Sequence, residues 1–179
     1  MAPAFTLILQ GSAVGTLALL CYQDWDKRSV SWPLFPFLFG VLLALQLQSQ
    51  PAATVGVTVL VNVGLLTVLV ATLRLYVYLR WPNLRLQDCL GSGDVLYWLV
   101  VAVCFSPTGF LLYLLGSSLI ALLMTGIMHW RNPQPLSTWR VPLAGIQAGC
   151  LLVLLTSRWA APDKAGYLLS ENLLAALLP

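Results

Sequence analysis

Apolar stretches separated by short polar segments run along the whole sequence, and charged residues lie almost only in the polar segments. The hydrocarbon core of a bilayer is about 30 Å thick, and a run of roughly 20 apolar helical residues can cross it. We expect an all-α fold, a polytopic integral membrane protein whose residues 1–179 form a single domain. The pattern predicts six transmembrane helices, at residues 4–23, 33–48, 53–80, 94–105, 108–129 and 141–159.

Two segments depart from the pattern of full crossings. A helix over residues 94–105 would rise only about 18 Å, so its start should lie below the membrane surface, or the loop should complete the crossing. Near the C-terminus, Ser170 before Glu171 is a helix start signal, and the leucines that follow form one apolar face. We therefore predict an interfacial helix at residues 168–178, lying in the interface on the outward face of the membrane.

The composition is typical of a membrane protein. Hydrophobic residues make up 59 % of the sequence and charged residues 8 %, whereas about 25 % of residues are charged in ordinary soluble domains. The net charge of +3 comes from residues scattered between apolar runs, so it predicts no nucleic-acid partner. The cysteines stand singly and His129 is the only histidine. We therefore predict no metal, no cofactor, and neither a zinc-dependent nor a histidine-based protease.

The cations are distributed unequally between the two predicted membrane faces. Seven cations lie in the segments after the first, third and fifth predicted helices, including the last turns of the third. These seven are Lys27, Arg28, Arg74, Arg80, Arg85, Arg131 and Arg140. The opposite face holds only Arg158 and Lys164. Because cytoplasmic loops carry the excess of Lys and Arg, both termini are predicted outside and Asp24 and Asp94 on the cytoplasmic face.

Asp24 and Asp94 are the candidate chemical groups, because each stands at the end of an apolar run. A carboxylate at membrane depth is energetically costly, and two adjacent carboxyls that share one proton can activate water and protonate a peptide bond. Gly91 and Gly93 precede Asp94 and are expected to permit positive φ angles and close approach of a substrate. The helix dipoles favour a charge on Asp94 and a proton on Asp24, so we expect this distribution in the resting pair.

These residues resemble two motifs of the type IV prepilin peptidases, which are G-x-G-D intramembrane aspartyl proteases. Asp24, followed by Lys27-Arg28 and then Val30, is similar to the family's first motif. Gly91-Ser92-Gly93-Asp94 is similar to the second motif. Pro142 and its apolar neighbours are similar to a proline-containing segment that lies near the family's active site. The resemblance covers essentially the whole chain.

The chain departs from the family pattern at Ser31-Trp32, where the first motif often continues with Pro-Asn, and at Leu96-Tyr97, where a basic residue is common. It also lacks the cysteine-paired insert of the larger, methylating enzymes, so it resembles the short preflagellin and tight-adherence prepilin peptidases. The resemblance implies an aspartic endopeptidase without methyltransferase activity. The residues it assigns are Asp24 and Asp94 as catalytic, and Gly91, Gly93 and Pro142 as substrate-binding or loop-shaping.

The resemblance also implies the substrates and the location. The partners would be pilin-like precursors with class III signal peptides, whose short basic leaders are removed at the cytoplasmic face of the bacterial inner membrane, and the surrounding membrane lipid.

Other functions fit the same residues. Asp24 and Asp94 could relay protons or cations in a small transporter or channel, although such proteins place their acids near the bilayer midplane. The chain could also be an inactive relative that only holds pilin-like helices. In the plainest interpretation Asp94 caps a helix and Asp24 forms an interfacial ion pair with Lys27.

Overall fold

A computed structural model describes residues 3–27, 29–80, 91–131 and 143–160, which form six α-helices. The all-α class is therefore confirmed for the described residues, whereas the interfacial helix predicted at 168–178 lies outside them. The helices are α1 (Pro3–Lys27), α2 (Leu34–Ser49), α3 (Ala52–Arg80), α5 (Ser92–Val101), α6 (Pro107–Arg131) and α7 (Leu143–Trp159).

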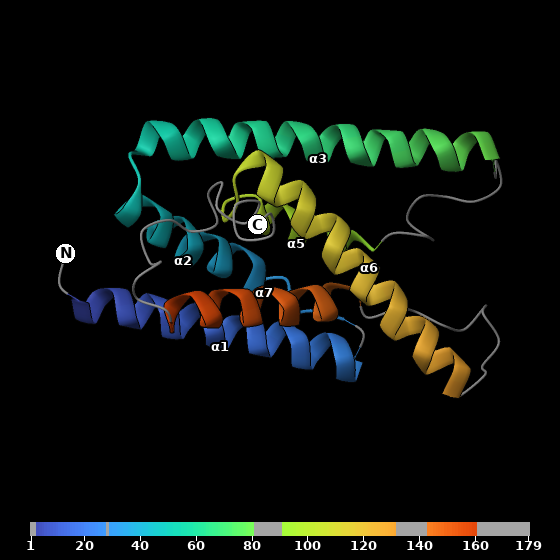
Figure 1. The fold of residues 1–179 in the computed structure, drawn as a ribbon, viewed down its shortest axis with the longest axis horizontal. Coiled ribbons are helices and arrows are strands. Elements are labelled where there is room, and N and C mark those ends of the chain that lie inside the picture. The colour runs from blue at the N-terminus through green and yellow to red at the C-terminus, as the bar shows by residue number, and fades with distance from the viewer. Residues whose placement is uncertain (1–2, 28, 81–90, 132–142, 161–179) are drawn as a thin grey trace, which may run out of the picture.

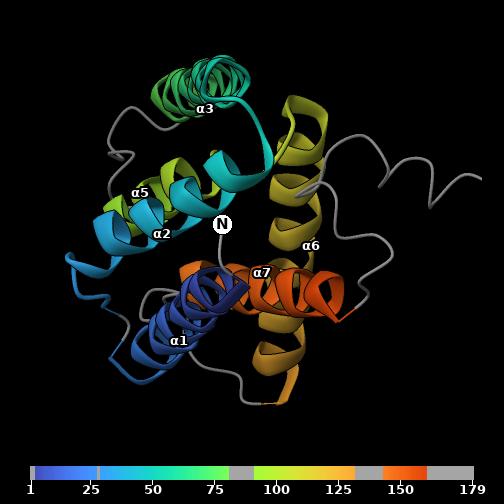
Figure 2. The same cartoon turned by 90° about the vertical axis from the view of Figure 1, so that its left-hand side faces the viewer.

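The helices pack in layers that one oblique helix crosses. α1 lies along α7, α2 and α5 form the next layer, and α3 lies outermost on the far side (Figures 1 and 2). α6 crosses these layers and packs against both α3 and α7. The C-terminal ends of α1, α3 and α6 point toward one end of the molecule, on the right in Figure 1, where α5 and α7 begin. Segments that are distant in sequence therefore meet at this end.

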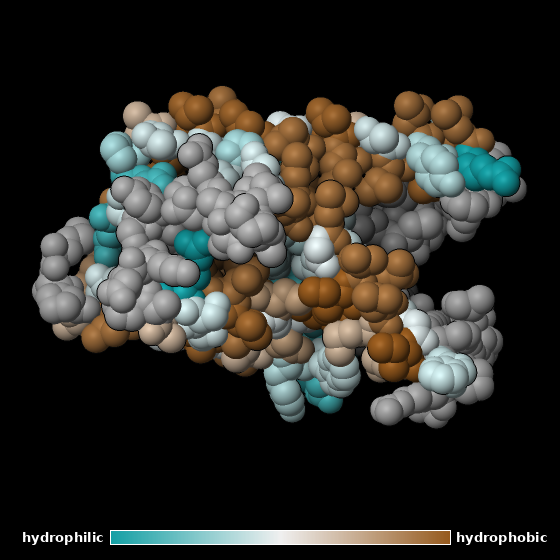
Figure 3. All heavy atoms as spheres, in the orientation of Figure 1, coloured by the Kyte–Doolittle hydropathy of each residue, from teal (hydrophilic) through white to brown (hydrophobic). Residues whose placement is uncertain are grey.

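Three of the helices are long and apolar enough to cross a membrane: Ala4–Lys27, Ala52–Arg80 and Pro107–Met128. Much of their apolar surface faces outward, as Figure 3 shows for one side of the molecule. Leu60 is 74 % exposed and Leu122 is 69 % exposed, and soluble monomers rarely expose apolar patches of this extent. These features indicate a membrane protein. The other three helices, α2, α5 and α7, are shorter, so six complete crossings remain a prediction.

The short helix α5 ends earlier than its apolar run. The sequence predicts a helix to residue 105, but α5 ends at Val101 and a turn follows. Side-chain amides from two neighbouring helices satisfy the carbonyls of this turn: Asn62 Nδ2 donates to Ala102 O (2.8 Å) and to Phe105 O (2.7 Å), and Gln46 Nε2 donates to Val103 O (2.9 Å). Non-helical backbone at membrane depth is tolerated only where protein satisfies it in this way.

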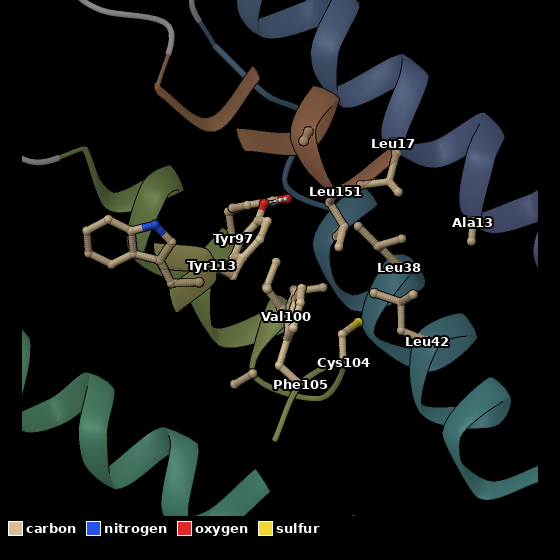
Figure 4. Packing of buried hydrophobic residues seen from close by; sticks show 14 of the residues in the cluster. Ala13, Leu17, Leu38, Leu42, Tyr97, Val100, Cys104, Phe105, Tyr113 and Leu151 are labelled. Atoms are coloured by element: carbon tan, nitrogen blue, oxygen red, sulfur yellow. Dashed lines mark hydrogen bonds between the residues drawn. The ribbon is translucent and has the colours of Figure 1, made fainter. Parts of the chain in front are cut away.

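A compact core joins α5 to its neighbours. Tyr97 and Leu38 are fully buried with Leu17 and Leu151, so α1, α2, α5 and α7 all contribute to one cluster (Figure 4). Hydrogen bonds add direction to this packing. The Tyr97 and Tyr113 hydroxyls lie 2.9 Å apart, and Tyr113 Oη donates to the carbonyl of Gln147 over 2.7 Å. The start of α5 is thereby fixed against α6 and α7.

Candidate active site

Asp24 lies one turn before the end of α1 and is only 8 % exposed. Its Oδ2 accepts a hydrogen bond from the backbone N–H of Gly145, with an N···O distance of 2.6 Å. Gly145 is the third residue of α7, and the first four N–H groups of a helix have no partner within the helix. The amino end of α7 therefore supplies a donor and a favourable dipole to a carboxylate that sits at the unfavourable end of its own helix.

Asp94 lies in the first turn of α5, a helix of ten residues that is too short to cross a bilayer. Burial, and secondly the negative charge of Asp24, raise the pKa of its carboxyl, which lies at about 6. Hydrogen bonds from the backbone amides of Gly91 and Ala144 act in the opposite direction and lower it. Asp94 is therefore a carboxyl that holds its proton more tightly than an exposed aspartate does.

The amino end of α7 brings the two aspartates together. Ala144 and Gly145 are consecutive, and their backbone amides reach Asp94 and Asp24 respectively. The charge of Asp24 acts on Asp94, so the carboxyls lie within electrostatic reach of each other. The raised pKa of Asp94 runs against the expectation from the sequence that this residue carries the resting charge. That expectation considered only the dipoles of α1 and α5 and overlooked the amide of α7.

Gly145 has no room for a side chain. A Cβ built there would lie 2.9 Å from Asp24 Oδ2 and 3.1 Å from Asp24 Cβ. The carbonyl of Gly145 accepts a hydrogen bond from Cys21 Sγ at 2.9 Å, so both backbone groups of this glycine contact α1. Sequence reasoning missed Gly145, because a backbone donor leaves no residue-type signature. The nearby residue it chose, Pro142, lies outside the described residues.

The two glycines of the G-x-G-D turn act differently from the prediction. Neither has a positive φ, and Gly91 has φ −66°, so that expectation was wrong. Gly91 instead leaves space for the aspartate, since a Cβ there would lie 3.0 Å from Asp94 Oδ2. Its carbonyl accepts the N–H of Asp94 at 3.1 Å, which starts the helix. At Gly93 a Cβ would meet only Phe35, at 4.0 Å.

A sequence profile of the type IV leader peptidase family matches residues 12–126. The chain belongs to this family. The match covers more than half of the chain and includes both Asp24 and Asp94, whereas α7 lies beyond it. No characterised protein and no solved structure gives a significant match to the chain. The family agrees with the resemblance that the two aspartate motifs indicated.

In this member of the leader peptidase family, a polar network near Asp94 holds α5 to α7. Trp98 Nε1 donates to Gln147 Oε1 at 2.8 Å, and both side chains are buried. Gln147 Nε2 in turn donates to Ser118 Oγ of α6 at 3.2 Å. Trp98 lies one turn after Asp94 on α5, and Gln147 lies two residues after Gly145 on α7. The network therefore fixes the register that places Asp94 near the amino end of α7.

Proposed function

We propose that the chain is an intramembrane aspartyl endopeptidase in which Asp24 and Asp94 are the catalytic pair. The observation that carries this proposal is the convergence of the two carboxyls on consecutive amides of α7, with one of them holding a proton to about pH 6. Hydrolysis of a peptide bond requires one base and one acid at the same place. A pair with one charge and one proton supplies both.

The mechanism follows from this distribution. Asp24 accepts a proton from a water molecule, and the oxygen of that water attacks the peptide carbonyl carbon. Asp94 donates its proton to the carbonyl oxygen, which gives a neutral tetrahedral intermediate. The intermediate collapses when the proton on Asp24 passes to the leaving nitrogen and the C–N bond breaks. Asp94 then recovers a proton from the hydroxyl that becomes the new carboxyl group.

The substrates in this proposal are pilin-like precursors with class III signal peptides, which lose short basic leaders without methylation of the new N-terminus. The cytoplasmic face of a bacterial inner membrane is the proposed location, with a multi-pass chain and both termini outside. Lys27 and Arg80 support this orientation, because they close α1 and α3 at the end of the molecule that holds both aspartates (Figure 1). The position of both acids at one end also favours a peptidase over a relay through the midplane.

The test is cleavage of a precursor with a basic leader by the purified protein in lipid. Asp24→Asn and Asp94→Asn should each lower kcat by at least about a hundredfold, because general acid–base catalysis contributes about 10²–10⁴-fold. Asp26→Asn is the matched control, since Asp26 is exposed and lies only two residues from Asp24. Cleavage that persists in either of the first two variants would refute the proposed pair.

A further inference from the structure

An apolar groove of about 610 Å³ lies between α6 and the pair formed by α1 and α7. Gly116 and Ile120 belong to its α6 wall, Gly149 and Val153 to its α7 wall, and Cys21 to the contribution of α1. Ile120 is 44 % exposed and Val153 is 62 % exposed. The groove therefore opens sideways, across the helices, toward the surface that lipid would contact.

The groove borders the candidate active site. Gly145 lines the groove and donates its amide hydrogen to Asp24 Oδ2 at 2.6 Å. Trp25, the chain neighbour of Asp24, also lines it. A peptide segment lying in the groove would thus place the adjoining peptide bond next to the Asp24 carboxyl.

The groove walls suit an apolar helix. None of the lining residues is charged, and the Tyr113 hydroxyl at the groove already donates to the Gln147 carbonyl. Ser117 Oγ likewise already donates a hydrogen bond, to Leu114 O at 3.4 Å. A Cβ built at Gly116 would meet no atom within 4 Å, so this position faces open space. Small residues of this kind let helix backbones approach each other closely in membranes.

We propose that this groove binds an apolar helical segment of the substrate, which enters sideways from the bilayer and carries the scissile bond at its end. The proposal rests on the proposed peptidase function, because the groove reaches the candidate active site through Gly145, which lines the groove and donates to Asp24. A basic leader does not fit an uncharged apolar groove. The apolar side of the scissile bond therefore lies in the groove, and the leader lies outside it.

Gly116→Leu tests the proposal, because it adds a side chain to the groove wall at a position where an added Cβ meets no atom within 4 Å. Gly126→Leu is the matched control: it lies on the same helix, also has no atom within 4 Å of an added Cβ, and does not line the groove. Two substrates are compared, a full precursor and a short peptide that has the leader and cleavage site but lacks the apolar segment. Gly116→Leu should lower kcat/KM about tenfold for the precursor, mainly through KM, and leave the short peptide unaffected. Gly126→Leu should leave kcat/KM unchanged for both substrates.

Photo-crosslinking gives a second readout that does not depend on turnover. A photoreactive residue at Val153 should crosslink to the precursor, and one at Leu122, which is exposed on α6 outside the groove, should not. Lipid adducts alone at Val153, or wild-type cleavage of the precursor by Gly116→Leu, would overturn the groove proposal and leave the peptidase function intact. Failure of the wild type to cleave either substrate would instead overturn the peptidase function, while crosslinking at Val153 would still report on the groove.

Discussion

Replacing Gly145 with alanine perturbs the contact that holds Asp24 in place. The new Cβ would lie 2.9 Å from Asp24 Oδ2 and 3.1 Å from Asp24 Cβ, so either the carboxyl or the first turn of α7 must move. Either movement disrupts the hydrogen bond that now spans 2.6 Å. A hydrogen bond to a charged group contributes about 1.5–3 kcal/mol, and about 1.4 kcal/mol corresponds to a tenfold change in rate. We therefore expect Gly145→Ala to lower kcat/KM by about 10- to 150-fold.

Gly149→Ala is the control for kcat, because Gly149 belongs to the groove wall and its substitution acts on KM in the proposed function. It adds the same methyl group one turn further along α7, where the Cβ would lie 3.4 Å from Cys21 Sγ, an ordinary van der Waals contact. Cleavage of a precursor in lipid gives kcat and KM for both variants, and thermal melting in detergent shows whether each is folded. The loss in Gly145→Ala should appear in kcat, because Asp24 acts on the reacting bond in the proposed mechanism. A folded Gly145→Ala enzyme with wild-type kcat would refute the reasoning that this glycine positions the carboxyl.

Two further measurements test other parts of the structure. Burial and the charge of Asp24 raise the pKa of Asp94 to about 6, so its proton is lost as the pH rises through 6. We therefore expect kcat/KM to fall above this pH. A flat pH profile of kcat/KM up to pH 8 would contradict the assignment of Asp94 as the acid. Asn62→Leu leaves the Ala102 carbonyl, among others, without its donor, and should cost about 1–3 kcal/mol of stability per unsatisfied group. Its melting temperature should therefore drop clearly below that of the control Thr67→Val, an exposed position on the same helix, and equal melting temperatures would contradict the role of Asn62.

The sequence predicts the helices well where charge or proline bounds an apolar run. The helix predicted at 53–80 is observed at Ala52–Arg80, and the one predicted at 108–129 at Pro107–Arg131. The prediction is poorer where tertiary contacts decide the boundary. α1 continues to Lys27, four residues past its predicted end, and this extension carries Asp24 to the start of α7. α5 ends early, and side-chain amides on other helices bind the carbonyls of the turn that follows it, which no local pattern reveals.

The site follows the same division. Asp24 and Asp94 could be chosen from sequence, because an acidic residue at the edge of an apolar run is costly and therefore conspicuous. Their proximity could not, because Ala144 and Gly145, which contact Asp94 and Asp24, act through their backbone amides. Gly145 carries no side chain, and it positions Asp24 through the hydrogen bond from its backbone N–H to Asp24 Oδ2, at 2.6 Å. The raised pKa of Asp94 could not be read from the sequence either, because it comes from burial and from the charge of Asp24.

The position of the α7 amino end explains why the pair should hold one charge and not two. The amino end of a helix acts roughly as half a positive elementary charge, so it can stabilise one neighbouring carboxylate but does not offset two. Ala144 and Gly145 present their amides to both carboxyls, and burial adds to the cost of ionising the second. In the proposed mechanism Asp24, with its short hydrogen bond to Gly145, takes the charge, and Asp94, whose pKa is raised, takes the proton. A single helix end can in this way set both the proximity and the protonation of two residues that lie 70 positions apart in the sequence.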